Sequence, residues 1–221
     1  NHYIESVWHL LKTIWNKDLI YQDYKVVPYD PRIGATLSSH EVAQGYREVD
    51  DPSITVRFPV IGEDKTYFLV WTTTPWTLPA NLALAVGASI DYAFVEHGGE
   101  TLILAAQLVD KVLGEGPHTI VRRVKGEDLM GLRYQRLFDE LPAEGDICRV
   151  LTADFVSTDD GPGIVHTAPA YGVDDLALGQ AHGLPVVHAI GLDGCFKDEV
   201  TPVQGQFFKD ADPTIIEILR E

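Results

Sequence analysis

The sequence predicts a β-rich α+β fold, in which short strands form a closed, barrel-like sheet with a few peripheral helices. Between residues 53 and 124, runs of β-branched and aromatic residues alternate with turn residues. Many short strands in close succession favour a barrel over a regular βαβ sheet. Hydrophobic residues make up 45% of the 221 residues, which is enough for an ordinary buried core. We expect three parts: an N-terminal helix and connecting segment (1–49), the barrel (50–205) and a C-terminal connecting helix (206–221).

Local patterns place the individual elements. Apolar residues at helical spacing predict a helix over 5–17, and Ser38 and Glu41 have the spacing of a capping box before a short helix or turn. Further helices are expected over 106–114, 173–182 and 211–221, the last beginning at Asp212 before Pro213. Extended segments or strands are expected over 25–29, 54–60, 66–74, 82–87, 91–97, 101–106, 118–124, 146–156, 161–169 and 185–191. Gly98-Gly99 is the clearest hairpin signal.

Charge and composition exclude several classes of protein. There are 17 basic and 33 acidic side chains, so the net charge is −16. Non-specific affinity for nucleic acid comes mostly from Lys and Arg, so this balance argues against a nucleic-acid module acting alone. No apolar run is long enough to cross a membrane. The chain opens NHYIESVWHLLK, without Met or a signal segment, so we expect a part of a longer cytoplasmic protein. Cys148 and Cys195 lie far apart, so neither a disulfide framework nor a thiolate metal site is expected.

Two groups of polar residues are weak candidates for a site. Ser38-Ser39-His40-Glu41 lacks the second His of an HExxH motif, since Gln44 stands there, and a capped turn explains it better. The histidines at positions 97, 118, 182 and 188 lack metal-ligand spacing. We interpret them as surface or core histidines.

The peptide VWTTTPWTLPAN (70–81) is a stronger candidate. Threonine favours strands, so a strand that ends in TTTP is ordinary in itself. However, Thr72 and Thr74 would share one face of that strand, with Thr73 on the other. The prolines then stop strand pairing. The result is a bent peptide that offers hydroxyls and free backbone groups as a polar wall for a pocket.

A second dense stretch is GPGIVHTAPAYGVDD (161–175). A Gly-rich turn leads into a strand that carries His166, and a loop then brings two carboxylates to the start of a helix. Asp174 and Asp175 have a simple structural explanation, because the helix dipole favours acids in the first turn. Alternatively, a helix start beside a His and a Gly-lined loop could bind a small polar ligand.

Together the two stretches resemble the editing (CP1) domain of isoleucyl-tRNA synthetase. WTTTPWTLPAN is similar to its threonine-rich peptide, GPGIVHTAPAYGVDD to its second motif, and LSSHEVAQGYREVDDPSITVRF to the segment that leads into it. The likeness runs from about Glu5 to the end. Valyl and leucyl enzymes carry Arg within TTRP, where this chain has TTTPW. The HIGH and KMSKS signatures of the synthetic site are absent. The family often has a zinc-associated Cys-x-x-Cys where this chain has Asp30-Pro31-Arg32-Ile33, so no zinc is expected there.

The resemblance implies an aminoacyl ester hydrolase of an aminoacyl-tRNA synthetase, which removes misattached valine and spares isoleucine. The expected substrates are Val-tRNA(Ile), valyl-adenylate or both. Thr72, Thr73, Thr74 and Asp175 would form the catalytic group. Asp175 would bind the α-ammonium of valine, and the threonines would hold the terminal adenosine, the ester and the attacking water.

Substrate binding would involve three more residues. His166 would border the side-chain pocket, while Trp71 and Asn81 would shape and brace the peptide. Catalysis would come from positioning an already activated ester and a water, with help from the terminal hydroxyl of the tRNA. His166 as a general base is the alternative.

The implied partners are the 3′ end of tRNA(Ile) carrying valine, valyl-adenylate and the rest of the synthetase, with no membrane. No cofactor is expected in this chain, because ATP and Mg belong to the synthetic site of the parent enzyme. A different class remains open: a non-catalytic small-ligand or protein-interaction barrel in which TTTP is a structural bend. Editing of another amino acid, such as threonine, is a further alternative that the missing Arg disfavours.

Overall fold

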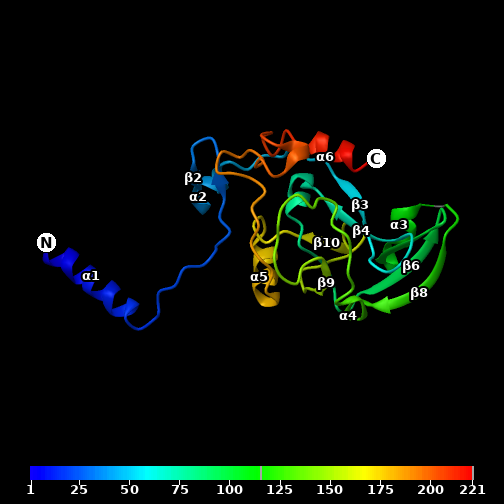
Figure 1. Ribbon diagram of the computed structural model, residues 1–221, viewed down its shortest axis with the longest axis horizontal. Coiled ribbons are helices and arrows are strands. Elements are labelled where there is room, and N and C mark those ends of the chain that lie inside the picture. The colour runs from blue at the N-terminus through cyan, green and yellow to red at the C-terminus, as the bar shows by residue number, and fades with distance from the viewer. Residues whose placement is uncertain (115, 221) are drawn as a thin grey trace.

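The computed structural model describes residues 1–114 and 116–220, and its centre is an eight-stranded mixed sheet (Figure 1). The strand order is β8-β6-β7-β4-β10-β5-β9, with β3 paired to β4 beside this path. The strands are β3 (Ile54–Pro59), β4 (Thr66–Thr72), β5 (Ala83–Val86), β6 (Asp91–His97), β7 (Glu100–Ala105), β8 (Thr119–Lys125), β9 (Arg149–Thr152) and β10 (Ile164–Thr167).

The sheet is barrel-like, as predicted, but it is not closed. Among the described strands, β8 and β9 stand at the two ends of the order, so the sheet curls into a half-barrel. Arg122, Arg123 and Lys125 are exposed on β8. Charged side chains of this kind protect a free strand edge from pairing with other chains.

Strand β4 is the hub of the sheet. It pairs antiparallel with β3 along its length, parallel with β7 through Thr66–Phe68, and parallel with β10 where Trp71 lies opposite Val165. Phe68 and Val70 point into the main core and Leu69 into another cluster, so the strand is buried on both faces. This central position holds the end of β4 firmly in place.

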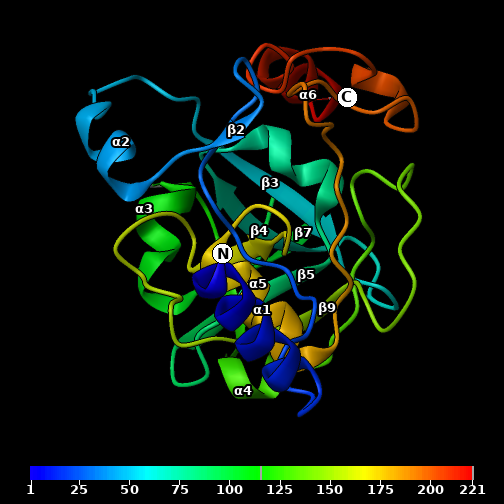
Figure 2. The same ribbon diagram turned by 90° about the vertical axis from the view of Figure 1, so that its left-hand side faces the viewer.

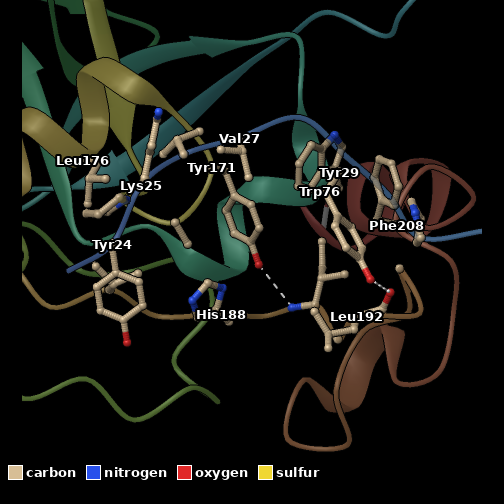
Figure 3. A pocket seen from close by; sticks show the side chains of 18 residues that line it. Tyr24, Lys25, Val27, Tyr29, Trp76, Tyr171, Leu176, His188, Leu192 and Phe208 are labelled. Atoms are coloured by element: carbon tan, nitrogen blue, oxygen red, sulfur yellow. Dashed lines mark hydrogen bonds between the residues drawn. The ribbon is translucent and has the colours of Figure 1, made fainter. Parts of the chain in front are cut away.

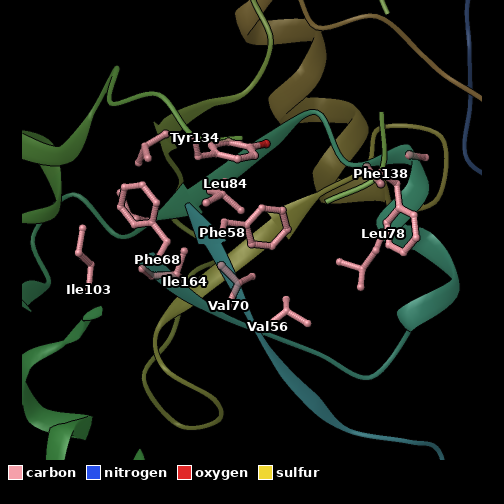
Figure 4. Close-up of a cluster of buried hydrophobic side chains, with 14 of the residues drawn as sticks. Val56, Phe58, Phe68, Val70, Leu78, Leu84, Ile103, Tyr134, Phe138 and Ile164 are labelled. Carbon is pink, nitrogen blue, oxygen red and sulfur yellow. The ribbon is translucent and has the colours of Figure 1, made fainter. Parts of the chain in front are cut away.

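Three apolar clusters lie on the two faces of the curled sheet. The largest fills its inside and includes Phe58 and Tyr134, whose rings meet edge to face at 5.3 Å (Figure 4). A second cluster joins β5 and β9 to α5 (Val173–His182) through Leu178, and a third joins β6 and β7 to α3 (Val109–Leu113) through Val109. Helices α5 and α3 therefore cover the outer face, as expected for peripheral elements.

The helix at the N-terminus stands away from the sheet (Figure 1). Helix α1 (His2–Trp15) is amphipathic as predicted, begins three residues earlier than expected, and buries none of its residues. An extended strap leads to the hairpin of β1 (Tyr29–Asp30) and β2 (Ala35–Thr36) and to α2 (Ser39–Gln44). The predicted capping box is present there, because Glu41 N donates to Ser38 Oγ at 3.3 Å and Ser38 N donates to the Glu41 carboxylate at 2.7 Å.

The remaining short helices are η1 (Pro75–Ala80), η2 (Ala106–Leu108), α4 (Gly126–Leu129), η3 (Thr201–Val203) and α6 (Asp212–Ile218). The hairpin at Gly98-Gly99 and the helix start at Asp212-Pro213 are confirmed. Helix α6 packs against η1 over one end of the sheet (Figures 1 and 2).

The predicted strand over 185–191 is wrong. This segment is irregular apart from an isolated bridge between Ile190 and Phe196. The backbone N–H groups of Ala189 and Ile190 donate to the Tyr171 hydroxyl at 2.9 and 3.1 Å. A side chain therefore takes the donors that a neighbouring strand would otherwise have used.

Candidate functional site

The carboxyl ends of β4 and β10 bring the two candidate stretches together. These strands are parallel and in register at Trp71 and Val165, so the next residues, Thr72 and His166, lie side by side. Thr72 Oγ1 is 3.5 Å from His166 Nε2, although 94 residues separate them in the chain. Helix α5 begins a few residues after β10 and brings Asp175 to the same place. The peptide and the second motif therefore form one site.

The threonine hydroxyls form a connected group. Thr72 Oγ1 and Thr74 Oγ1 are 3.3 Å apart, which agrees with the prediction that they share a face. The backbone N–H of Thr74 donates to Thr72 Oγ1 at 3.0 Å, and Thr74 Oγ1 lies 3.2 Å from Thr77 Oγ1. Strand β4 ends at Thr72 because Pro75 opens the η1 turn. The hydroxyls thus follow a bent peptide, as expected.

His166 is a buried, neutral wall of the site. Its side chain is in contact with Thr77 Oγ1 through Nε2 at 2.9 Å, and the residue is only 7% exposed. Burial lowers the pKa of His166 to about 4, because the charged imidazolium would lose its hydration. The imidazole is therefore uncharged at neutral pH and a weak base.

Asp175 is the carboxylate of the site. Its Oδ1 accepts a hydrogen bond from Ala168 N at 2.8 Å, and burial raises the pKa of Asp175 above its usual value. Its neighbour Asp174 is exposed. Asp175 stands in the first turn of α5 and also lines the pocket, a position that fits either sequence interpretation. A half-buried carboxylate of this kind is well suited to a cationic ligand group.

These groups line one pocket of about 230 Å³. Its lining residues are Trp71, Thr72, Thr73, Thr74, Thr77, Val165, His166, Ala168, Tyr171 and Asp175. Six of the seven predicted site residues are therefore brought together.

Trp71 is held at the edge of this pocket by two neighbours. Its Nε1 donates to Ser53 Oγ at 2.6 Å. Gly161 has φ +65, and a Cβ there would lie 2.6 Å from the Trp71 Cβ. Only glycine suits both that left-handed backbone and that close approach.

Asn81 is the predicted site residue that lies outside the pocket. It is 1% exposed, its Nδ2 donates to Ala83 O at 3.0 Å, and its Oδ1 accepts from the Tyr134 hydroxyl at 2.6 Å. These bonds tie the end of the threonine peptide to the core. Asn81 therefore has the position of a brace.

Thr77, Tyr171 and Asp212 belong to the site or support it, and sequence reasoning missed them. Thr77 follows Thr74 by three residues, which places the two side chains together in a 3₁₀ turn. Tyr171 lies within the second motif. Asp212, from α6, accepts a hydrogen bond from Trp76 N at 2.9 Å, and no local pattern links residues 136 positions apart.

A larger, mostly apolar pocket of about 390 Å³ adjoins the first one and shares Tyr171 with it (Figure 3). Its aromatic lining residues are Tyr24, Tyr29, Trp76, Tyr171, His188 and Phe208. The extended strap before β1 forms one of its walls, and Tyr29 fastens that strap by donating to Leu192 O at 3.0 Å.

Within residues 1–114 and 116–220, no three His, Cys, Asp or Glu side chains gather as a metal site would require. The expectation that no zinc binds near Asp30 stays a prediction. In the same residues, none of the helices is long and apolar enough to cross a membrane.

Residues 1–193 match the family described as tRNA synthetases class I (I, L, M and V). The chain belongs to this class I synthetase family. Among similar synthetases, the isoleucine–tRNA ligases of Clostridium kluyveri and Clostridium novyi are each 51% identical over the whole chain, and that of Thermobifida fusca is 44% identical over 99% of it. The isoleucyl-type resemblance is thereby confirmed. The chain spans 21% of the length of each of these synthetases.

Solved synthetase structures share the fold. The crystal structure of GlLeuRS-CP1 superposes with a TM-score of 0.60 at 16% identity and covers 76% of this chain and 95% of its own. The editing domain of the P. falciparum cytosolic leucyl-tRNA synthetase has a TM-score of 0.55 at 12% identity, over 72% and 78% of the two chains. The β-rich, barrel-like fold is therefore that of these class I synthetase domains.

Proposed function

We propose that this chain is the editing part of an isoleucyl-type synthetase, which hydrolyses misattached or misactivated valine and excludes isoleucine. The observation that carries the proposal is the pocket at the ends of β4 and β10, where a half-buried carboxylate faces a row of threonine hydroxyls and a neutral histidine. The whole-chain similarity to isoleucine–tRNA ligases supports the choice of amino acid.

A synthetase for isoleucine needs such a site for a physical reason. A pocket built for isoleucine cannot reject valine strongly, because one missing methylene is worth only ~1–3 kcal/mol, a magnitude for which enzymes of this very family are the standard example. A second pocket can discriminate sharply in the opposite direction, because inserting an extra methylene into a packed site is costly.

In this proposal Asp175 anchors the α-ammonium group of valine. Binding a cation lowers the pKa of a carboxyl group, so the ligand would offset the cost of burying the carboxylate. The bent peptide of Thr72, Thr73 and Thr74 then holds the ester and a water by hydroxyl and backbone groups. The ester is already activated, and orienting the reactants supplies much of the acceleration.

His166 acts as the size limit of the pocket in this proposal. A base with a pKa of about 4 is a poor acceptor for a proton from water at neutral pH, and its Nε2 is already in contact with Thr77. His166→Ala is therefore expected to keep hydrolysing valyl ester and to begin attacking isoleucyl ester. Loss of all hydrolysis in that variant would make His166 the base instead.

The larger pocket suits the adenosine that both candidate substrates carry. It adjoins the first pocket at Tyr171 and is lined by aromatic rings, on which nucleobases stack favourably. Valinamide, which lacks adenosine, should accordingly bind more weakly than valyl-aminoadenosine.

The rest of the synthetase supplies what this chain lacks. With a net charge of −16 it is expected to bind whole tRNA weakly by itself, while the single-stranded 3′ end enters the site. The parent enzyme would provide the basic tRNA surface and the ATP- and Mg-dependent synthetic site. The proposed location is the cytoplasm, where the charged tRNA is used.

Calorimetric titration with non-hydrolysable valyl- and isoleucyl-aminoadenosine tests the proposal. We expect the valyl compound to bind, the isoleucyl compound to fail, and Asp175→Ala to abolish binding. The matched control is Asp174→Ala, which changes the exposed neighbour on the same helix turn and should bind like the unchanged chain.

Other outcomes point elsewhere. Equal binding of both compounds would refute the size limit. Binding that does not depend on Asp175, together with inert Thr72 and Thr74 substitutions, would favour the non-catalytic binding barrel.

A further inference from the structure

The hydroxyl of Thr77 lies between two groups that compete for its single proton. Its Oγ1 is 2.8 Å from the Thr74 carbonyl oxygen and 2.9 Å from His166 Nε2. Thr77 is only 5% exposed, so its hydroxyl has little access to solvent. The direction of the two hydrogen bonds therefore decides where His166 carries its proton.

The arrangement favours one direction. A carbonyl oxygen can only accept, and the geometry has Thr77 Oγ1 donating to Thr74 O. With that bond, His166 Nε2 is the N–H that donates to Thr77. Thr74 O also accepts the Thr77 backbone N–H at 2.9 Å, so the surroundings of Nδ1 decide between the two tautomers. The opposite tautomer would place the proton on Nδ1, which is buried and finds no hydrogen-bond partner among the described residues. Buried N–H groups without a partner are rarer and more costly than buried acceptors without one.

We propose that Thr77 is a positioning residue that fixes His166 in the Nε2–H tautomer and in one ring orientation, and thereby sets the size limit of the valine pocket. The size-limit part of this inference rests on the proposed function. The tautomer part rests on the hydrogen-bond geometry alone.

The bond to Thr77 also removes His166 Nε2 from proton transfer. An Nε2 that carries a proton and donates it to a neighbour has no lone pair in the ring plane for an attacking water. The edge of the ring that faces the threonines then offers one fixed N–H donor and no lone pair to accept a proton. Thr72 Oγ1, at 3.5 Å, adds only a weak contact on that side.

Two variants of the 221-residue chain test the inference. Thr77→Val keeps the shape of the side chain and removes its hydroxyl, while Thr77→Ser keeps the hydroxyl. Nitrogen-15 NMR of the histidine rings reports the tautomer, and the spectrum of His166→Gln identifies the His166 signals among the eight histidines. We expect the Nε2–H tautomer in the unchanged chain and in Thr77→Ser, and its loss or mixing in Thr77→Val.

Calorimetry with valyl- and isoleucyl-aminoadenosine measures the size limit. In Thr77→Val, the ratio of the affinity for the isoleucyl compound to that for the valyl compound should be roughly tenfold higher than in the unchanged chain. A change of this size corresponds to about one buried hydrogen bond. Thr77→Ser should restore the original ratio, which a merely structural defect would not predict.

Each half of the inference has a result that overturns it. An Nδ1–H tautomer in the unchanged chain refutes the proton assignment without any variant. An unchanged ratio in a folded Thr77→Val refutes the role in selectivity. If the unchanged chain binds neither compound, the proposed function and the size limit fail together, and the NMR result still decides the tautomer.

Discussion

The carboxylate of Asp175 folds back against the backbone of Gly172, in the space that a side chain at Gly172 would occupy. A Cβ at position 172 would lie 1.9 Å from Asp175 Oδ2. Gly172 has φ −139, which any residue adopts, so the requirement for glycine comes from the close approach and not from the backbone angle. Gly172, the N-cap residue of α5, therefore decides where the carboxylate of the site stands.

Gly172→Ala should displace the Asp175 carboxylate and abolish binding of valyl-aminoadenosine. The clash is with a side chain that can rotate away, so we expect a loss of stability of only about 1–3 kcal/mol. Calorimetry and urea unfolding measure the two effects. Val173→Ala, at an exposed position one residue further along, is the control and should bind normally. Normal binding by Gly172→Ala would show that Asp175 does not need this position.

Asp175→Asn should make the domain more stable at neutral pH while removing its binding of the amine. Burial raises the pKa of Asp175, so the folded state favours the protonated carboxyl group and ionisation opposes folding. The sign follows: the contribution of Asp175 to stability is greatest below its unfolded pKa of 3.8 and is lost as the pH rises through the raised folded value.

The melting temperatures of this variant and of the unchanged chain, measured from pH 3 to pH 8, check that expectation. The advantage of Asp175→Asn should be present at neutral pH and shrink towards acid. The exposed Asp174→Asn serves as the control. A variant that is less stable at pH 7 would mean that the charged carboxylate itself supports the fold, through the helix dipole and its bond to Ala168.

His166 should make the domain sensitive to acid. The unfolded imidazole titrates near 6.5 and the folded one at about 4, so the unfolded chain binds a proton first as the pH falls. The free energy of unfolding should therefore fall between pH 6.5 and pH 4, by about 3 kcal/mol in all. Urea unfolding at several pH values would show a flatter curve for His166→Gln. His9→Gln, which changes an exposed histidine, should keep the original slope.

Asp212→Ala should loosen the threonine peptide from a distance. The Asp212 carboxylate accepts the backbone N–H of Trp76 at the start of η1, so its removal leaves that donor without its partner. Losses of this kind cost about 0.5–2 kcal/mol, as for a helix cap. We expect Asp212→Ala to bind valyl-aminoadenosine more weakly and to be less stable. Asp212→Asn should behave almost normally, and the exposed Asp210→Ala should show neither effect. Full binding of valyl-aminoadenosine by Asp212→Ala would mean that α6 does not support the site.

Much of the secondary structure was predictable because its signals are local. Helix α5 has the bounds that its apolar spacing predicts, and the capping box of Ser38 and Glu41 forms as its three-residue spacing indicates. The segment over 185–191 was mispredicted for a tertiary reason. Its pattern suits a strand, but the hydroxyl of Tyr171 takes its backbone donors.

The placement of some site residues follows from local spacing, and the placement of others depends on the tertiary structure. The hydroxyls of Thr72 and Thr74 lie 3.3 Å apart, as their two-residue spacing predicts, although β4 itself ends at Thr72. The burial of Asn81 against Tyr134 depends on a hydrogen bond between residues 53 positions apart, and no local spacing indicates it.

The sequence by itself determined the elements, the two motifs and the family resemblance, since these depend on residue types and on spacings of two to four positions. Only the tertiary structure decided that the two motifs form one pocket. The parallel pairing of β4 with β10 places Thr72 beside His166, and α5 adds Asp175. Which residues of distant strands lie opposite one another depends on how both faces of the sheet pack, and so on the whole chain at once.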